Sequence, residues 1–469
     1  MSKAMMTNVS IRYCAAMGLA MLCGLAMTPV LRGQEAARPN VLLILADDMC
    51  LGDLARNNGG LNRTPRLDQL AQQSVYLAHG YSGSAVCAPA RAALLTGRYP
   101  HRTGVTSLSA KSGLTRLRLD ETTIADLFAA QGYATGLVGK WHTGDGPEFH
   151  PLKRGFQEFA GFVAGDGAIK NYFKYSLDIQ GKQVPFEDRY LTDHFTELSI
   201  DFIRHHRDEP FFLHLAHYAP HRPLNAPQKI VDRYKKQGFS ENTAIIYAMI
   251  EVLDCGVGQV LDELDKLGLS DNTIVIFSSD NGLDPLPGER GGGHRFNCNL
   301  RGTKYTVHEG GIHVPFMIRW PGQLKPGVND TLVQFQDVLP TLAAACGIDL
   351  PDSLQLDGRN VLEALRRGQT APAPVRYWQW NRGVPLYSHN AAMRDGRWKL
   401  VRPFVSRNNI HQESKKPPML FDLRNDPAEQ HNLADKYPQR TAEMNQSLAA
   451  WADSVERDRT RPMSKESVR

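Results

Sequence analysis

Several features that mark whole classes of protein are missing from this sequence. Its 469 residues contain no internal repeat, no closely spaced cysteine pair and no zinc-ligand pattern. The formal net charge is only +5, and about +3 of it lies beyond residue 36. This mild excess does not indicate a nucleic-acid partner, although it is compatible with an anionic substrate. Beyond the N-terminus we find no segment apolar enough to span a bilayer, so we expect no stable membrane association.

Residues 1–36 differ from the rest of the chain. Lys3 and Arg12 precede an apolar run at residues 14–30, and small residues follow it at 33–37. The apolar core is too short and too rich in small residues for a membrane span, which favours a secretory signal peptide. A retained signal anchor is the competing interpretation. We therefore expect an exported protein, either periplasmic or secreted.

The cysteines give no disulfide framework. Two of the seven, Cys14 and Cys23, lie within the N-terminal apolar run. The wide spacing of the others does not decide between disulfides and buried free thiols. This leaves open the state of Cys50, Cys255, Cys298 and Cys346.

Predicted buried strands alternate with predicted helices along the chain. Continuous apolar runs, which are typical of strands in a parallel sheet, occupy residues 41–46, 135–139, 211–216, 273–278 and 314–320. Helical periodicity occupies residues 64–74, 123–131, 193–206 and 243–267. This alternation predicts an α/β fold with a large, mostly parallel sheet flanked by helices. In such sheets the active site lies beyond the carboxyl ends of the strands.

The pattern changes after about residue 366. An A-P-A-P stretch at 371–374 is typical of a linker. Asp395-Gly396 is a hairpin signal between two of the short strands that follow. These strands are predicted at residues 375–380, 391–393, 398–401 and 419–423, and a helix is predicted at 438–457. The C-terminal region therefore reads as a small α+β subdomain with a short antiparallel sheet.

Oxygen-bearing side chains follow two of the predicted buried strands. Asp47 and Asp48 end the first strand, and Asp280 and Asn281 end the fourth. Either pair alone is weak evidence, since Asp and Asn also occupy turns and helix caps. Together, at the ends of two buried strands, they favour a hard divalent cation such as calcium.

The most informative stretch is S-G-S-A-V-C-A-P-A-R-A-A-L-L-T-G-R, which contains Cys87 and Arg91. A loop of small residues leads into Cys87 and a helical pattern follows it. The thiol therefore lies where backbone N–H groups and the helix dipole attract anions. Arg91, four residues later, is expected to project toward the same place. A buried cysteine at a helix start is the alternative interpretation.

This stretch resembles the signature of the type I, formylglycine-dependent sulfatases, which are arylsulfatase-like members of the alkaline phosphatase superfamily. The resemblance runs from residue 39 to about 433 and includes P-N-V-L-L-I-L-A-D-D, G-K-W-H, A-P-H-R-P and I-V-I-F-S-S-D-N-G. It implies an alkaline-phosphatase-like fold. After the signal peptide at 1–36, we expect a catalytic sulfatase domain at 37–366, a C-terminal subdomain at 367–458 and a flexible tail at 459–469.

The resemblance implies a modified nucleophile and a metal. A formylglycine-generating maturase would oxidise Cys87 to 3-oxoalanine (formylglycine), and one hydroxyl of the hydrated aldehyde would attack sulfur and displace the alcohol. The other hydroxyl would then lose its proton and expel sulfate. One calcium ion would be bound by Asp47, Asp48, Asp280 and Asn281, with residue 87 completing its coordination.

Further side chains take roles that the resemblance implies. Lys140 in G-K-W-H would bind the sulfate and position the nucleophile, and His142 would contact the formylglycine hydroxyl. His221 in A-P-H-R-P would contact the sulfate and protonate the leaving oxygen. Lys304 would bridge the sulfate and the leaving group. Arg91, with both lysines and the metal, would stabilise the charge that develops in the transition state.

Two residues that lie near proposed site residues in the sequence are expected to have structural roles instead. His217 lies close to His221, but we favour His221 because the prolines around it restrict the backbone. Glu309, which precedes two glycines, is expected to hold the loop that carries Lys304. The loop at 284–297 contains G-G-G-H-R and does not match the family, so we expect it to be substrate-specific.

The predicted activity is the hydrolysis of sulfate monoesters, on sulfated glycans or other exported sulfated substrates. A phosphoester or phosphonate-ester hydrolase of the same superfamily is one alternative, and a non-catalytic glycan-binding protein that has kept the fold is another. The preference for glycans rests on export and on aromatic and cationic side chains in variable regions, although such aromatics are more often core. These residues are Tyr172, Phe173, Trp378, Trp380, Arg382 and His389.

Overall fold

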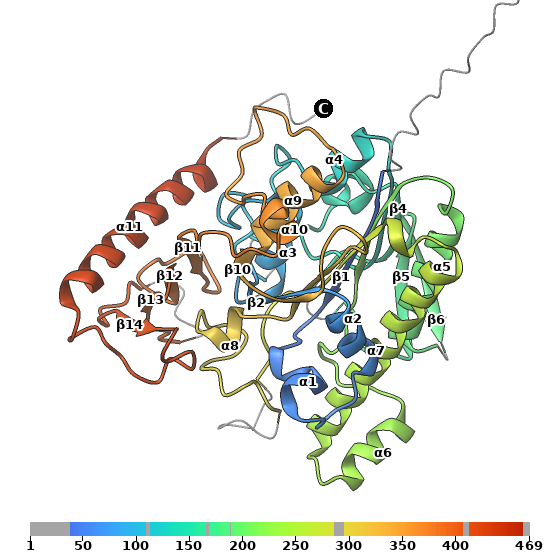
Figure 1. Ribbon diagram of the computed structural model, residues 1–469, viewed down its shortest axis with the longest axis horizontal. Helices are drawn as coiled ribbons and strands as arrows, with labels where there is room; N and C mark the ends of the chain where they lie inside the picture. Colours follow the sequence, from blue (N-terminus) through green and yellow to red (C-terminus); the bar gives the residue numbers. More distant parts are fainter. Residues whose placement is uncertain are drawn as a thin grey trace, which may run out of the picture. The chain divides into compact units, whose positions relative to one another are not determined.

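A computed structural model describes residues 38–108, 113–165, 168–187, 189–285, 295–406 and 412–462 (Figure 1). Arg38–Arg469 form one compact unit. The expected signal peptide at 1–36 lies outside the described residues, as do residues 463–469 of the expected tail and most of the G-G-G-H-R motif. The domain boundary at residue 366 stays a prediction.

A ten-stranded sheet forms the frame of the larger region, in the order β10-β2-β9-β8-β1-β7-β3-β4-β5-β6. Its centre, from β8 to β4, is parallel, whereas β5, β6 and β9 run antiparallel to their neighbours. The strands are β1 (Asn40–Ala46), β2 (Val75–Tyr81), β3 (Ala134–Lys140), β4 (Glu158–Phe162), β5 (Lys174–Ile179), β6 (Lys182–Glu187), β7 (Phe211–Ala216), β8 (Thr273–Ser279), β9 (Phe316–Arg319) and β10 (Gly327–Gln334).

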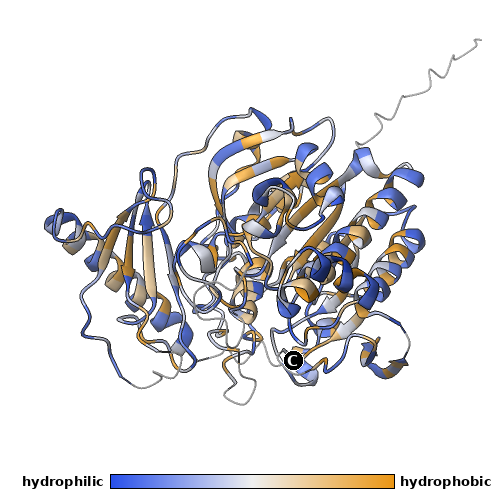
Figure 2. Ribbon diagram, turned by 90° about the horizontal axis from the view of Figure 1, so that it is seen from below, coloured by the Kyte–Doolittle hydropathy of each residue, from blue (hydrophilic) through white to orange (hydrophobic). Residues whose placement is uncertain are grey.

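Helices pack on both faces of this sheet because its central strands are apolar on both sides. In β1, Leu42 and Ile44 join a core built with α2, α5, α6 and α7, whereas Leu43 and Leu45 join one built with α3, α4, α9 and α10. Figure 2 shows the hydrophobic strands between helices whose other faces are hydrophilic. The helices are α1 (Ala55–Asn58), α2 (Pro65–Gln72), α3 (Cys87–Thr96), α4 (Ile124–Ala130), α5 (Leu191–His205), α6 (Gln228–Lys236), α7 (Glu241–Lys266), α8 (Glu309–Ile312), α9 (Val338–Ala345), α10 (Leu362–Arg366) and α11 (Pro438–Thr460).

The expectation that no segment beyond the N-terminus is apolar enough to span a bilayer is wrong. Helix α7 is long and apolar enough to cross a bilayer by length and composition. However, 78% of its most apolar 18-residue window is buried inside the protein. Apolar residues of α7, including Tyr247, Leu253 and Val257, pack in the hydrophobic core on one face of the sheet.

The predicted C-terminal sheet is confirmed. Four antiparallel strands lie in the order β11-β12-β13-β14, and β12 and β13 join through the expected turn at Asp395 and Gly396. Helix α11 packs on them through residues such as Leu448 and Trp451, and it continues to Thr460, two residues into the segment expected to be a tail. The strands are β11 (Arg376–Gln379), β12 (Ala391–Asp395), β13 (Trp398–Arg402) and β14 (Met419–Asp422).

Candidate active site

The carboxyl ends of β1 and β8 bring four oxygen-bearing side chains together. The two strands pair in parallel, with Ala46 opposite Ser279, so the residues that follow them lie side by side. Asp48 adopts a left-handed backbone conformation (φ 69°), and its N–H donates to Asp280 Oδ1 at 3.2 Å. Asp47, Asp48, Asp280 and Asn281 are all buried.

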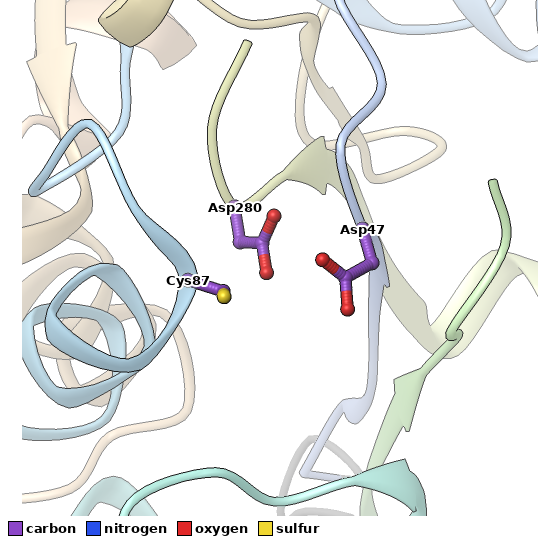
Figure 3. A group of neighbouring side chains, drawn as sticks. All are labelled: Asp47, Cys87 and Asp280. Atoms are coloured by element: carbon purple, nitrogen blue, oxygen red, sulfur yellow. The ribbon is translucent and has the colours of Figure 1, made fainter. Parts of the chain in front are cut away.

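Cys87 faces these carboxylates from the first residue of α3. Potential ligand atoms of Asp47, Cys87 and Asp280 all lie within 4.8 Å of one another, and Figure 3 shows the three side chains converging. Asp47, Asp48 and His221 form a second group of this kind. The predicted metal ligands and the predicted nucleophile are therefore brought to one place.

Three buried cations surround the carboxylates. Arg91 donates from Nε and Nη2 to Asp280 Oδ2 at 3.0 and 2.8 Å. Lys140 Nζ lies 2.5 Å from Asp47 Oδ2, and Lys304 Nζ lies 2.6 Å from an oxygen of Asp48. We call this group the site cluster: Asp47, Asp48, Asp280, Asn281, Arg91, Lys140 and Lys304.

The site cluster leaves two buried oxygens without partners. Asp47 Oδ1 and Asn281 Oδ1 accept no hydrogen bond from any described residue. A buried acceptor without a partner costs free energy, which a bound group would recover. Carboxylate and amide oxygens are the ligands that calcium prefers, so these residues fit a calcium ion.

The pKa values show how strongly these buried charges interact. Burial, together with the charge of Asp47, raises the pKa of Asp280 to about 6. Burial would also raise the pKa of Asp47, but Lys140, followed by His221 and Arg91, holds it well below its usual range. A cation between the two carboxylates would relieve their repulsion.

Cys87 is not an activated thiol. Burial raises its pKa to about 12, although Lys140 and Lys304 act in the opposite direction. The thiolate is the reactive form of cysteine, and at neutral pH this side chain stays protonated. The geometry therefore agrees better with a precursor of the nucleophile than with a thiol nucleophile.

His221 is held at the edge of the cluster. Its Nε2 lies 3.8 Å from Asp48 Oδ2, and its Nδ1 lies 2.7 Å from the carbonyl of Arg222, to which it donates. The hydroxyl of Tyr172 donates to the carbonyls of Tyr218 and His221, which fixes this turn. Tyr172 is thus a core residue that supports His221.

The other histidines of the sequence analysis lie deeper. His142 is buried two residues after Lys140, with its ring against Gly165. His217 is fully buried beside Phe195, and burial lowers its pKa to about 3. The low pKa keeps His217 neutral, which agrees with the structural role that we expected.

Most of the aromatic and cationic residues that pointed to a glycan are core, which is the commoner place for such aromatics. Tyr172, Trp378, Trp380 and His389 are almost completely buried, whereas Phe173 and Arg382 are exposed. The preference for glycans therefore gains no support from Tyr172, Trp378, Trp380 and His389. The cysteines whose pairing was open are free: Cys50, Cys255, Cys298 and Cys346.

Two supporting pairs were missed by the sequence analysis. Arg295, at the end of the loop expected to be substrate-specific, donates to both carboxylate oxygens of Asp53 and to the carbonyl of Asp48 at 2.7 Å. Arg222 forms an ion pair with Asp284. The only sequence signal for either pair was an ionisable residue beside a recognised motif.

Comparisons with known proteins agree with this geometry. Residues 39–348 match the sulfatase family, and residues 302–454 match the family described as N-sulphoglucosamine sulphohydrolase, C-terminal. The chain is 32% identical to human arylsulfatase A, over 92% of this chain and 88% of that protein. It is 31% identical to mouse N-acetylgalactosamine-6-sulfatase, over 84% of this chain and 82% of that protein.

Solved structures show the same relationship. The crystal structure of Ps i-CgsB in complex with k-i-k-neocarrahexaose is 28% identical, has a TM-score of 0.77, and matches over 92% of this chain and 96% of that one. The family match spans more than half of the chain, and the curated relatives are sulfuric ester hydrolases by name. The chain therefore belongs to the sulfatase family and is a sulfuric ester hydrolase.

Proposed function

We propose that this enzyme removes sulfate from exported sulfated glycans, using formylglycine derived from Cys87 and one calcium ion. The observation that carries the proposal is the position of Cys87, whose protonated thiol meets the carboxylates of Asp47 and Asp280. When present, formylglycine supplies a hydrated aldehyde whose hydroxyl can attack sulfur. Bound calcium supplies positive charge for the sulfate oxygens.

The chain's own side chains would complete the site. Lys140 and Lys304 would hold the sulfate oxygens, and Arg91 would orient the carboxylate of Asp280. Cationic groups aimed at developing negative charge are usually the largest contribution to such catalysis. His221 would donate a proton from Nε2 to the leaving oxygen, because its Nδ1 proton is engaged by a carbonyl.

A saccharide substrate is supported by two relatives and by one ion pair. Ps i-CgsB is known in complex with an oligosaccharide, and N-acetylgalactosamine-6-sulfatase is named for a sulfated sugar. In this chain, the side chain of Arg222 is 38% exposed, and its partner Asp284 keeps one buried oxygen without a hydrogen bond among the described residues. A guanidinium beside a carboxylate can bind sugar hydroxyls, which both donate and accept.

Peptide mass spectrometry tests the modification. We expect the peptide containing residue 87, from a host with a competent maturase, to have lost one sulfur and two hydrogens and gained one oxygen. The same preparation should hydrolyse p-nitrophenyl sulfate faster than p-nitrophenyl phosphate. An unmodified Cys87 in fully active enzyme would refute the mechanism, and a clear preference for the phosphate ester would favour the phosphoester alternative.

A panel of defined sulfated saccharides tests the substrate class. We expect desulfation of at least one sugar sulfate with a kcat/KM above that for p-nitrophenyl sulfate. Activity confined to aryl sulfates would contradict the glycan assignment while leaving the sulfatase assignment intact. Export is tested separately, by sequencing the N-terminus of protein recovered from the periplasm or the medium.

A further inference from the structure

A second buried group of charges joins the C-terminal sheet to the segment that carries Lys304. Lys399, on β13, has a fully buried side chain, and its Nζ lies 2.7 Å from Glu309 Oε1 and 3.0 Å from Glu429 Oε1. Both glutamates are also buried. We call these three residues the loop cluster. It brings together positions that lie far apart in the sequence.

The loop cluster fixes the base of the loop at residues 301–311. Glu429 Oε2 accepts the backbone N–H of Glu309 at 2.8 Å and lies 3.0 Å from His308 Nδ1. Arg301 donates to the carbonyl of Glu429 at 3.0 Å, and the N–H of Gly310 donates to the carbonyl of Arg301 at 2.7 Å. Both ends of the loop are therefore tied to the C-terminal region.

The loop is too tightly packed to absorb a movement at its base. A Cβ atom added at Gly310 would lie 2.2 Å from the carbonyl oxygen of Gly302, and one at Gly311 would lie 2.0 Å from that of Thr306. Close-packed segments transmit strain rather than dissipate it. The N–H of Lys304 also donates to the carbonyl of Leu283 at 2.9 Å. The position of Lys304 therefore depends on this hydrogen bond as well as on the loop.

We propose that Lys399 is a positioning residue for catalysis, which sets the location of Lys304 through Glu309 and Glu429. The proposal rests on the role of Lys304 proposed above. Removing Lys399 takes away the one ammonium that pairs with both buried carboxylates, and the repulsion between them then acts at the base of the loop. Because small misplacements of a catalytic group are costly, turnover falls even though Lys399 touches no substrate.

The chain offers a matched control in Arg376. This residue lies on β11 of the same sheet, is buried, and has its Nη2 2.5 Å from Asp337 Oδ1. Lys399→Met and Arg376→Met each remove a buried cation from the C-terminal sheet. Only Lys399 forms an ion pair with the loop at residues 301–311, which carries Lys304. We expect both variants to melt at lower temperature, and only Lys399→Met to lower kcat, by about tenfold or more with little change in KM.

Two kinetic readouts separate positioning from general destabilisation. In a double-mutant cycle, Lys399→Met should change kcat less than about twofold once Lys304→Ala is present. Lys399→Met should also slow sulfate esters with poor leaving groups more than p-nitrophenyl sulfate, as we expect Lys304→Ala to do. If Lys399→Met does not fold, Glu309→Gln takes its place in the same cycle, because it removes one partner and keeps the Lys399–Glu429 pair.

The outcomes of the double-mutant cycle distinguish the role of Lys399 from that of Lys304. Independent, multiplicative effects of the two substitutions, or an equal loss of kcat in Arg376→Met, would overturn the positioning role of Lys399. A Lys304→Ala enzyme that keeps wild-type kcat would instead refute the proposed role of Lys304 itself. Loss of kcat in Lys399→Met that vanishes in the Lys304→Ala background supports the proposal.

Discussion

The site cluster and the loop cluster are both buried groups of carboxylates and cations, yet their electrostatics differ. In the loop cluster, burial would raise the pKa of Glu309, but Lys399 and then His313 hold it well below its usual range. The second carboxylate oxygen of Glu309, Oε2, accepts a hydrogen bond from the hydroxyl of Tyr81 at 2.6 Å. In the site cluster, the pKa of Asp280 is raised to about 6, and Asp47 keeps an unpartnered oxygen. In the loop cluster, Glu429 Oε1 also accepts no hydrogen bond, but it lies 3.0 Å from the ammonium of Lys399. Both oxygens of Glu309 are hydrogen-bonded, which indicates a structural role, whereas the unpartnered oxygens of Asp47 and Asn281 indicate a place for a ligand.

Removing the side chain that faces the site cluster should give the largest effect. Cys87→Ala cannot become an aldehyde, so we expect kcat for p-nitrophenyl sulfate to fall by about a thousandfold or more, with the melting temperature nearly unchanged. Steady-state kinetics and thermal melting measure the two quantities. Turnover close to wild type in this variant would remove Cys87 from the mechanism.

Calcium should act on the site cluster alone. We expect calcium to raise the melting temperature of the wild-type protein, since ligand at 100 times its Kd stabilises a fold by about 2.7 kcal/mol. Asn281→Ala removes one of the unpartnered oxygens and should abolish this shift and lower kcat by about a hundredfold. Glu309→Gln, which changes the loop cluster, should keep the calcium shift. An equal loss in both variants would erase the distinction between the clusters.

Acid should produce a smaller effect through histidines that belong to neither cluster. Burial lowers the pKa of His101 and of His214 to about 4 from an ordinary 6.5. The unfolded chain therefore takes up these protons first as the pH falls. Stability is full above about pH 6.5 and declines toward pH 4, by at most about 1.4 kcal/mol per pH unit for each histidine.

Thermal melting between pH 7 and pH 5 measures this decline. The variant His214→Leu should show a shallower pH dependence than wild type, whatever its melting temperature at pH 7. An unchanged slope would mean that the acid sensitivity originates elsewhere, including the carboxylates of the two clusters.

The central strands and the site could be predicted from the sequence because their signals are local. Residues 41–46 form a continuous apolar run that ends in two aspartates, and the structure has the strand and the aspartates where the pattern put them. Strand β9 was predicted, but its antiparallel direction was not, since direction depends on neighbours. Strand β6 was missed because it is an edge strand with a proline and exposed polar residues.

The loop cluster could not be predicted in the same way. Lys399 pairs with Glu309 across 90 positions of sequence. Nothing local distinguishes Lys399 from a surface lysine, because its burial depends on how the second sheet packs against the first. The role expected for Glu309, which was to hold the loop, agrees with its contacts, but its partner became visible only in three dimensions.

The contacts of Lys399 also bear on how the chain can be divided for engineering. The two matched families overlap at residues 302–348, and Glu309 lies in that overlap. A chimera joined at residue 366, where composition suggests a linker, would take Glu309 from one parent and Lys399 and Glu429 from the other. Such hybrids should work only when both parents carry the same charged triad, so the useful crossover points lie before residue 301.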